Sequence, residues 1–393
     1  MRLVHEEVPM GAQSSRPWQA ARRILCVRLD SLGDVLMCTP AIRALRQSLP
    51  GCHLTLLSSP SGAAVAPYIP ELDAAIGFRA PWMKHDHPMG AQALQECAAQ
   101  LAAQRFDAAV MFTSYSQSPL PAAMLCQLAG IPLRLASCRE NPYQLLTHWV
   151  PERERERATR HEVQRQLDLV ADVGCTTSDT SLSFAVAAAH AARVSAMLEE
   201  GAVDPAAPYL VLHAGASAAS RRYPVRHWLV LIGMLRRQFK HKIILTGDGN
   251  DVEALRPLTD GWRSPAHSLI GKLGLGELGA LIRGASLLIT GNTGPAHIAA
   301  AVGTPLVDLY ALTNPQHTPW RVAHRLLFHD VSCRNCLRSS CPQGHHACLD
   351  SVAPRTVLEA AVELLAAAPH RPARTDDATL AFASSGRIDA GRL

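Results

Sequence analysis

A carboxylate and a glycine stand next to each other near the start of the chain, in residues 31–34 (SLGD). The segment follows a short apolar run and opens a helical pattern, and α/β proteins place catalytic or phosphate-binding groups at such strand-to-helix turns. Gly33 permits close approach of the backbone, and Asp34 puts a carboxylate at the helix start. A helix cap is the commoner role for an acidic residue there, so this segment alone leaves both roles open.

Polar, glycine-containing loops follow four apolar runs in the second half of the chain, at residues 213–217, 246–249, 290–294 and 313–314. One such loop would mean little, but four at the same edge of a parallel sheet indicate a nucleotide site. Ser217, in the first of these loops, is a candidate for binding the phosphates.

The third loop continues into a helix through residues 291–297 (GNTGPAH). Because Pro295 suits a first helical turn, we expect the N–H groups of Thr293 and Gly294 to be free to bind an anion beside the helix dipole. His297 lies on the same turn and could donate to a phosphate oxygen, although a core histidine bonded to the backbone is the alternative. A diphosphate would fit such a site.

Three further side chains are candidates for contacts with a nucleotide. Arg221, in the segment RRYP, can neutralise a pyrophosphate leaving group because guanidinium pairs well with phosphate oxygens, and a solvated basic turn is the alternative. Asp251 and Glu253 follow the loop at 246–249 and are candidates for hydrogen bonding to the ribose.

The last cluster is C-x2-C-x4-C-x6-C, made of Cys333, Cys336, Cys341 and Cys348. In a reducing compartment it suggests tetrahedral thiolate ligation of structural zinc or iron, with His345 or His346 able to replace one cysteine. The later spacings are shorter than in a typical zinc ribbon, and four reduced thiols on an ordinary loop are the alternative. The other cysteines stand singly and are interpreted as buried or free thiols.

The elements that position these residues alternate short apolar runs with helical patterns, which is typical of parallel α/β sheets. Residues 151–160 (PERERERATR) are interpreted as a solvated, charged surface. The predicted strands span 24–29, 53–57, 106–112, 209–213, 242–246, 287–290 and 305–310. The predicted helices span 35–49, 119–128, 161–173, 225–239, 275–282 and 295–302, with another ending near Gly201.

A chain of 393 residues and 42.3 kDa is too long for one ordinary hydrophobic core. The α/β rhythm predicts an extension at 1–20, a Rossmann-like domain at 21–185, a second one at 186–368 that carries the cysteine cluster at 333–348, and a disordered tail at 369–393. Ligands are expected at the carboxyl ends of the strands, where the two domains meet.

Composition excludes some classes of function. With 48% hydrophobic and 18% charged residues the chain is globular, and a net charge of +5 with scattered arginines does not indicate nucleic acid. The sequence has no apolar run of membrane-spanning length, and the first twenty residues lack the apolar centre of a signal peptide. We therefore expect a cytoplasmic protein.

Three motifs, in this order, resemble those of the heptosyltransferases of glycosyltransferase family nine: RILCVRLDSLGDVLMCTPAIRAL, HAGASAASRRYP and LLITGNTGPAHIAAAVGTPLVDLY. The resemblance covers nearly the whole folded chain. It implies a GT-B fold, an ADP-heptose donor, no cofactor for the transfer, and an inverting reaction on the lipopolysaccharide inner core at the cytoplasmic membrane face.

The resemblance also implies roles for individual residues. Asp34 would be the general base that takes the proton of the acceptor hydroxyl. Arg221 occupies the place of a lysine that contacts the donor phosphate, and Thr293, Gly294 and His297 would hold the diphosphate. Asn292 departs from the family, which usually has Asp there.

Two further features carry over from the family. Arg134, in the segment GIPLR, is a candidate for meeting an anionic acceptor group such as the carboxylate of the acidic sugar Kdo, with a surface arginine as the alternative. The cysteine cluster is similar to one that binds iron in heptosyltransferases that modify autotransporter proteins.

The sequence therefore predicts a glycosyltransferase that transfers a heptose-like sugar to a lipid-linked or core-oligosaccharide acceptor, with peripheral contact at the inner membrane. Two alternatives stay open at this point. One is a non-hydrolysing nucleotide-sugar epimerase of the same architecture, and the other is a non-catalytic nucleotide-binding protein with a metal-stapled loop.

Overall fold

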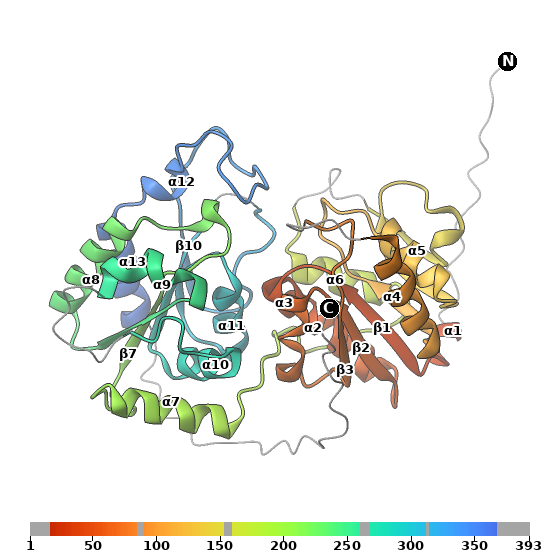
Figure 1. Ribbon diagram of the computed structural model, residues 1–393, viewed down its shortest axis with the longest axis horizontal. Helices are drawn as coiled ribbons and strands as arrows, with labels where there is room; N and C mark the ends of the chain where they lie inside the picture. The colour runs from red at the N-terminus through yellow and green to blue at the C-terminus, as the bar shows by residue number, and fades with distance from the viewer. Residues whose placement is uncertain (1–15, 85–89, 153–158, 260–267, 312–313, 368–393) are drawn as a thin grey trace.

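The computed structural model describes residues 16–84, 90–152, 159–259, 268–311 and 314–367. It consists of two lobes side by side, each a parallel sheet covered by helices (Figure 1). The predicted α/β class with two parallel sheets is confirmed. The predicted tail at 369–393 and most of the predicted extension lie outside the described residues, but Trp18 of that extension is fully buried in the core.

The N-terminal lobe contains a six-stranded sheet in the order β3-β2-β1-β4-β5-β6. Its strands are β1 (Arg23–Arg28), β2 (His53–Ser58), β3 (Ala74–Gly77), β4 (Ala108–Met111), β5 (Leu133–Cys138) and β6 (His148–Pro151). Its helices are α1 (Arg16–Gln19), α2 (Leu32–Ser48), α3 (Pro60–Ala63), α4 (Ala91–Ala103), α5 (Leu120–Leu128) and α6 (Glu162–Ala171).

The C-terminal lobe contains a five-stranded sheet in the order β11-β10-β9-β7-β8. Its strands are β7 (Tyr209–His213), β8 (Lys242–Thr246), β9 (Leu287–Gly291), β10 (Leu306–Leu309) and β11 (His324–Leu327). The helices are α7 (Ala188–Glu200), α8 (Val225–Gln238), α9 (Val252–Thr259), α10 (Leu275–Gly284), α11 (Gly294–Val302), α12 (Ala347–Asp350) and α13 (Pro354–Ala367).

Helices cover both faces of each sheet, so the central strands are buried along almost their whole length and are mainly apolar. Every residue of β7 and β9 is buried, as are five of the six in β1. This burial explains why continuous apolar runs, and not alternating patterns, mark these strands in the sequence.

Each sheet has one place where the strand order reverses. In the N-terminal sheet β1 lies between β2 and β4, and in the C-terminal sheet β7 lies between β8 and β9. The loops leaving β1 and β4, and those leaving β7 and β9, therefore diverge to opposite faces and leave a crevice at the carboxyl ends of the strands. These two crevices are where the fold places ligands.

The lobes contact each other through the first turns of α2 and α11. A Cβ atom added at Gly33 would lie 2.6 Å from Cδ2 of His297, and one at Gly294 would lie 2.8 Å from Cδ2 of Leu32. The chain after β10 also crosses to the N-terminal lobe, where the N–H of Glu162 donates to the carbonyl of Gln316. The two turns can meet this closely only because each carries a glycine.

In the described part of the chain, no helix combines the length and the apolar character that crossing a membrane requires.

The lobe contact makes a testable prediction for Gly33→Ala. The new methyl group must displace the His297 ring, so we expect a loss of about 1–3 kcal/mol in the free energy of unfolding, measured with urea. Gly233→Ala in α8 is the matched control, because its Cβ would meet only the end of Arg237, at 3.7 Å. The control should gain up to about 1 kcal/mol from helix propensity. Equal stability of the two variants would contradict the close lobe contact.

Candidate active site

The guanidinium of Arg28, at the end of β1, is fully buried and is surrounded by three carboxylates. Its Nε lies 2.8 Å from Oδ2 of Asp30, its Nη2 3.3 Å from Oδ1 of Asp34, and its Nη1 2.6 Å from Oε1 of Glu162. One buried cation therefore fixes the two aspartates that follow β1 relative to α6.

Asp34 lies on the first turn of α2, where it is both a helix cap and an ion-pair partner. Its Oδ2 accepts hydrogen bonds from the backbone N–H of Ser31 at 3.1 Å and from the hydroxyl of Ser31 at 2.7 Å. Burial alone would raise its pKa, but Arg28, then His317 and the Ser31 hydroxyl, hold that pKa well below its usual range. Asp34 can therefore cap the helix and still be ionised at neutral pH, which is the state in which it could accept a proton.

Asp30 has the opposite electrostatic character. Burial raises the pKa of Asp30 to about 6, although Arg28 and the hydrogen bond from Gln117 oppose the rise. The amide of Gln117 donates to Oδ1 of Asp30 at 2.5 Å. Two neighbouring carboxylates thus share one arginine and titrate in different pH ranges.

Two residues of this cluster, Glu162 and His317, were not predicted from the sequence. Glu162 is fully buried, and Arg28 and Arg165 outweigh the effect of burial and lower its pKa. Nδ1 of His317 lies 3.6 Å from Asp34, and its Nε2 lies 4.0 Å from Glu162. His317 comes from the segment that crosses between the lobes, so it brings a C-terminal-lobe side chain to the carboxylate of the N-terminal lobe.

The interpretation of residues 151–160 as a solvated surface is wrong at one end. The side chain of Glu152 is only 4% exposed and pairs with Arg165, with 2.5 Å between Oε2 and Nη2. This pair extends the Arg28–Glu162 cluster along α6, because Arg165 also lies 3.0 Å from Glu162. Residues 153–158 lie outside the described part of the chain.

The crevice of the C-terminal lobe contains several buried polar atoms that have no hydrogen-bond partner within the described residues. They are Nε of Arg221, Oγ1 of Thr290, Oδ1 of Asn292, Nδ1 of His297 and both carboxylate oxygens of Asp308. A buried polar group without a partner costs stability, so several such groups close together indicate a ligand site. Arg221 also donates from Nη1 to the carbonyl of Asn292 at 3.3 Å, which places it over the start of α11.

His297 lies at the junction of the two crevices. Burial lowers its pKa to about 3, so the imidazole is neutral and has one N–H and one lone pair to offer. The ring packs against Gly33, and Asp34 is among the charges that act on it. Ligand contact, the first of the two predicted roles, stays a prediction.

Of the two N–H groups predicted to be free at the start of α11, that of Thr293 is already bonded, so this part of the prediction is wrong. The N–H of Thr293 donates to the carbonyl of Gly291 at 2.7 Å, because the chain turns sharply between β9 and α11. Thr293 caps the helix without a side-chain hydrogen bond to it. An anion at this terminus would therefore be held by fewer backbone groups than predicted.

Three other candidates, Arg134, Asp251 and Glu253, make contacts within the protein, and a fourth, Ser217, is exposed. The guanidinium of Arg134 is buried and donates to the carbonyls of Ile131, Gln144 and Leu145. Its donors are therefore used within the protein and are not available to the sugar acceptor. Asp251 accepts from the N–H of Asp248 in a capping box, and Glu253 is exposed and pairs with Arg256. Ser217 is exposed on the loop after β7.

The four clustered cysteines and His345 line one small space of about 20 Å³. The N–H of His346, followed by those of Gln343, Gly344 and His345, lowers the pKa of Cys341. Sγ of Cys333 lies 3.8 Å from Nε2 of His345. Nowhere in the described residues do three such side chains converge closely enough to ligate a common ion, so a metal here stays a prediction.

Two doubly wound lobes with crevices that meet at Asp34 and His297 define the GT-B class of glycosyltransferases. The chain belongs to glycosyltransferase family 9 (heptosyltransferase), whose model matches residues 95–347. It is therefore a glycosyltransferase, which sets aside the epimerase and the non-catalytic alternatives.

Known proteins resemble the chain over most of its length. Lipopolysaccharide heptosyltransferase 2 of Escherichia coli K12 is 25% identical over 86% of this chain and 97% of its own. The fold matches a family 9 glycosyltransferase from Veillonella parvula with a TM-score of 0.73 and 22% identity, over 88% of this chain and 98% of the other. It also matches the ADP-heptose lps heptosyltransferase II of E. coli with a TM-score of 0.68 and 22% identity, at the same coverage.

The raised pKa of Asp30 predicts a pH-dependent stability. An unfolded aspartate titrates near about 4, so the fold favours the protonated form, and the stability from this group is lost as the pH rises through about 6. Asp30→Asn cannot ionise at this position. We therefore expect the difference in free energy of unfolding between the variant and the unsubstituted protein to shift in favour of the variant as the pH rises from 4 to 7, measured by urea titrations.

Asp179→Asn is the matched control for this titration, since hydrogen bonds from Ser181 lower the pKa of Asp179. Its difference from the unsubstituted protein should stay constant over that range. Parallel stability curves for Asp30→Asn and the unsubstituted protein would show that folding does not raise the pKa of Asp30.

The cysteine loop predicts bound metal in protein that is purified without oxygen. We expect elemental analysis to find about one zinc or iron ion per chain, since four such ligands complete a tetrahedral site. Replacing Cys333 and Cys336 by serine should remove the metal, whereas Cys97→Ala, at a singly placed cysteine, should leave it. Metal-free protein with four titratable thiols in the loop would show an ordinary reduced loop.

Proposed function

We propose that the protein is an inverting heptosyltransferase that uses ADP-heptose and modifies the lipopolysaccharide core or a related surface glycan. The observation that carries this proposal is the position of Asp34, an ionised carboxylate held by Arg28 and Ser31 at the point where the two crevices meet. The names of its relatives support the sugar and the acceptor, since they include lipopolysaccharide heptosyltransferases. The name of the E. coli ADP-heptose lps heptosyltransferase II, which has the same fold, supports ADP as the carrier of the sugar.

In this reaction the acceptor hydroxyl attacks the anomeric carbon while its proton passes to Asp34. The low pKa of Asp34 keeps the carboxylate ionised before the attack. It also makes Asp34 a weak base, so the proton moves as bond formation makes the hydroxyl more acidic. His317 lies 3.6 Å from the same carboxylate and can orient it.

The leaving diphosphate would lie in the C-terminal crevice. Arg221 provides a cation there, and the start of α11 adds the positive end of its dipole. The Nε–H of Arg221 and the Nδ1 of His297, when that nitrogen carries the proton, would donate to the phosphate oxygens. Binding of a lipid-linked acceptor would bring the enzyme to the cytoplasmic face of the inner membrane.

The proposal predicts different effects of one substitution on transfer and on donor binding. Asp34→Asn should lower kcat by about 100-fold to 10,000-fold, the usual contribution of a general base. It should leave unchanged the rise in melting temperature caused by ADP, because the donor crevice keeps its contacts. Release of ADP from ADP-heptose with a core-oligosaccharide acceptor measures the first effect, and a thermal-shift titration measures the second.

Asp168→Asn is the control, because that carboxylate is exposed and, among the described residues, pairs with Arg160 and the Gln164 amide. It should change neither quantity. Stabilisation by UDP or GDP in place of ADP would reject the heptose donor, and full activity of Asp34→Asn would reject the assigned base.

A further inference from the structure

A cavity of about 300 Å³ opens at the strand-order reversal of the N-terminal sheet. Its walls come from the ends of β1 and β4, the loops after β3 and β4, and the start of α5. The volume is at the lower end of the range for small-molecule pockets. Because this is the crevice between β1 and β4, the fold itself predicts a ligand here.

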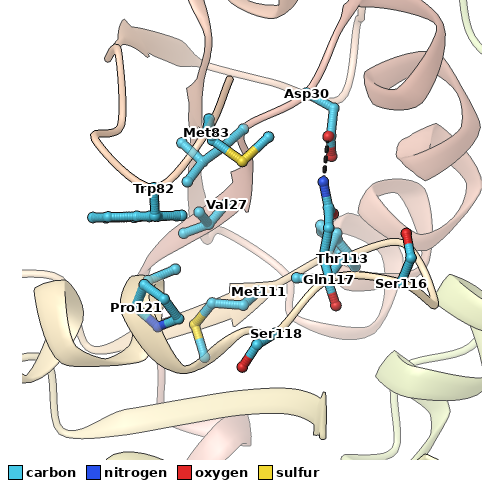
Figure 2. Close-up of a pocket in the computed structure, with 13 residues that line it drawn as sticks. Val27, Asp30, Trp82, Met83, Met111, Thr113, Ser116, Gln117, Ser118 and Pro121 are labelled. Atoms are coloured by element: carbon cyan, nitrogen blue, oxygen red, sulfur yellow. Dashed lines mark hydrogen bonds between the residues drawn. The ribbon is translucent and has the colours of Figure 1, made fainter. Parts of the chain in front are cut away.

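The cavity has one apolar and one polar side. Figure 2 shows Trp82 and Pro121 on the side opposite Asp30 and Gln117, with the hydrogen bond between the latter two closing the polar side. Such a division suits a sugar ring, which presents C–H groups to an aromatic face and hydroxyl groups to a carboxylate and an amide.

The charges of the lining exclude one class of acceptor. Among the described residues that line the cavity, Asp30 is the ionisable one, and none is lysine, arginine or histidine. Against this described lining, an acidic sugar such as Kdo would meet a carboxylate and no basic side chain, which is unfavourable in a partly buried site. Arg134, the candidate for such an acid, is bonded to backbone carbonyls.

The cavity adjoins the reacting centre through Arg28. The same guanidinium contacts Asp30, on the cavity wall, and Asp34, the base of the proposed reaction. We propose that this cavity binds an uncharged sugar ring of the acceptor, with Trp82 against its C–H face and Asp30 and Gln117 on its hydroxyl groups. This inference rests on the proposed function, and it names the acceptor class.

Binding of simple glycosides tests the inference without the transfer reaction. Saturation-transfer NMR and calorimetry on the full chain with ADP would compare a neutral methyl heptoside with the methyl glycoside of Kdo. We expect the heptoside to bind and Kdo to bind at least about tenfold more weakly. Trp82→Ala should weaken heptoside binding about tenfold, the scale of one lost ring contact, whereas Tyr143→Ala, at an exposed tyrosine, should not.

Asp30→Asn separates a binding role from a catalytic one. It should raise KM for the acceptor more than it lowers kcat, in contrast to a substitution of the base. Equal or tighter binding of the Kdo glycoside, no binding of either glycoside, or heptoside binding that is insensitive to Trp82→Ala would overturn the inference. Competition by 1-octanol without competition by the heptoside would assign the cavity to an acyl chain and overturn it as well.

The two proposals fail in different ways. Loss of the ADP thermal shift would reject the donor assignment while heptoside binding is still measured. An intact ADP shift without heptoside binding would reject the acceptor class alone.

Discussion

The site depends on one buried cation, Arg28. Its guanidinium is the common partner of Asp30, Asp34 and Glu162, and it has no exposed surface. Burying an arginine is costly unless charges and hydrogen bonds compensate, and removing one partner from such a cluster typically costs several kcal/mol. The cluster is therefore a rigid unit, and it fixes where the first turn of α2 lies.

Three carboxylates surround this one cation, and two of them, Asp34 and Asp30, have pKa values shifted in opposite directions. Asp34 has the additional hydrogen bonds of Ser31 and the nearby His317, and its pKa falls. Asp30 has the Gln117 amide, and burial dominates and raises its pKa to about 6. One arginine thus supports a carboxylate that is always ionised beside one that is easily protonated, which is how a site can divide proton acceptance from hydrogen bonding to a substrate.

Much of the fold could be predicted from the sequence, because local patterns determine it. The predicted strands at 209–213 and 242–246 are β7 and β8 to the residue, and the predicted helix at 225–239 is longer than α8 by one residue. The short strands β3, β6 and β11 have no such pattern, since they lie at or near sheet edges and are only partly buried. No strand was predicted for any of the three.

The site was predictable only where its residues follow the strands. Asp34, Arg221 and His297 each follow the carboxyl end of a strand, so parallel topology brings each of them to that edge of its own sheet. Glu162 is 134 residues from Arg28 and sits in a charged stretch, so only the packing of α6 on α2 shows that it is buried. The donation from Thr293 to Gly291 likewise depends on backbone angles that residue types do not determine.

The arginines explain how the two crevices come to suit different ligands. In the N-terminal lobe Arg28 and Arg165 neutralise buried carboxylates, and Arg134 satisfies backbone carbonyls. These arginines are therefore paired within the lobe, and the cavity beside them is lined by the carboxylate of Asp30 and the indole of Trp82. In the C-terminal lobe Arg221 keeps an Nε without a partner over the start of α11. The positive charge available to a ligand therefore lies in the crevice that we propose for the diphosphate, whereas the proposed acceptor cavity offers shape and hydrogen-bonding groups.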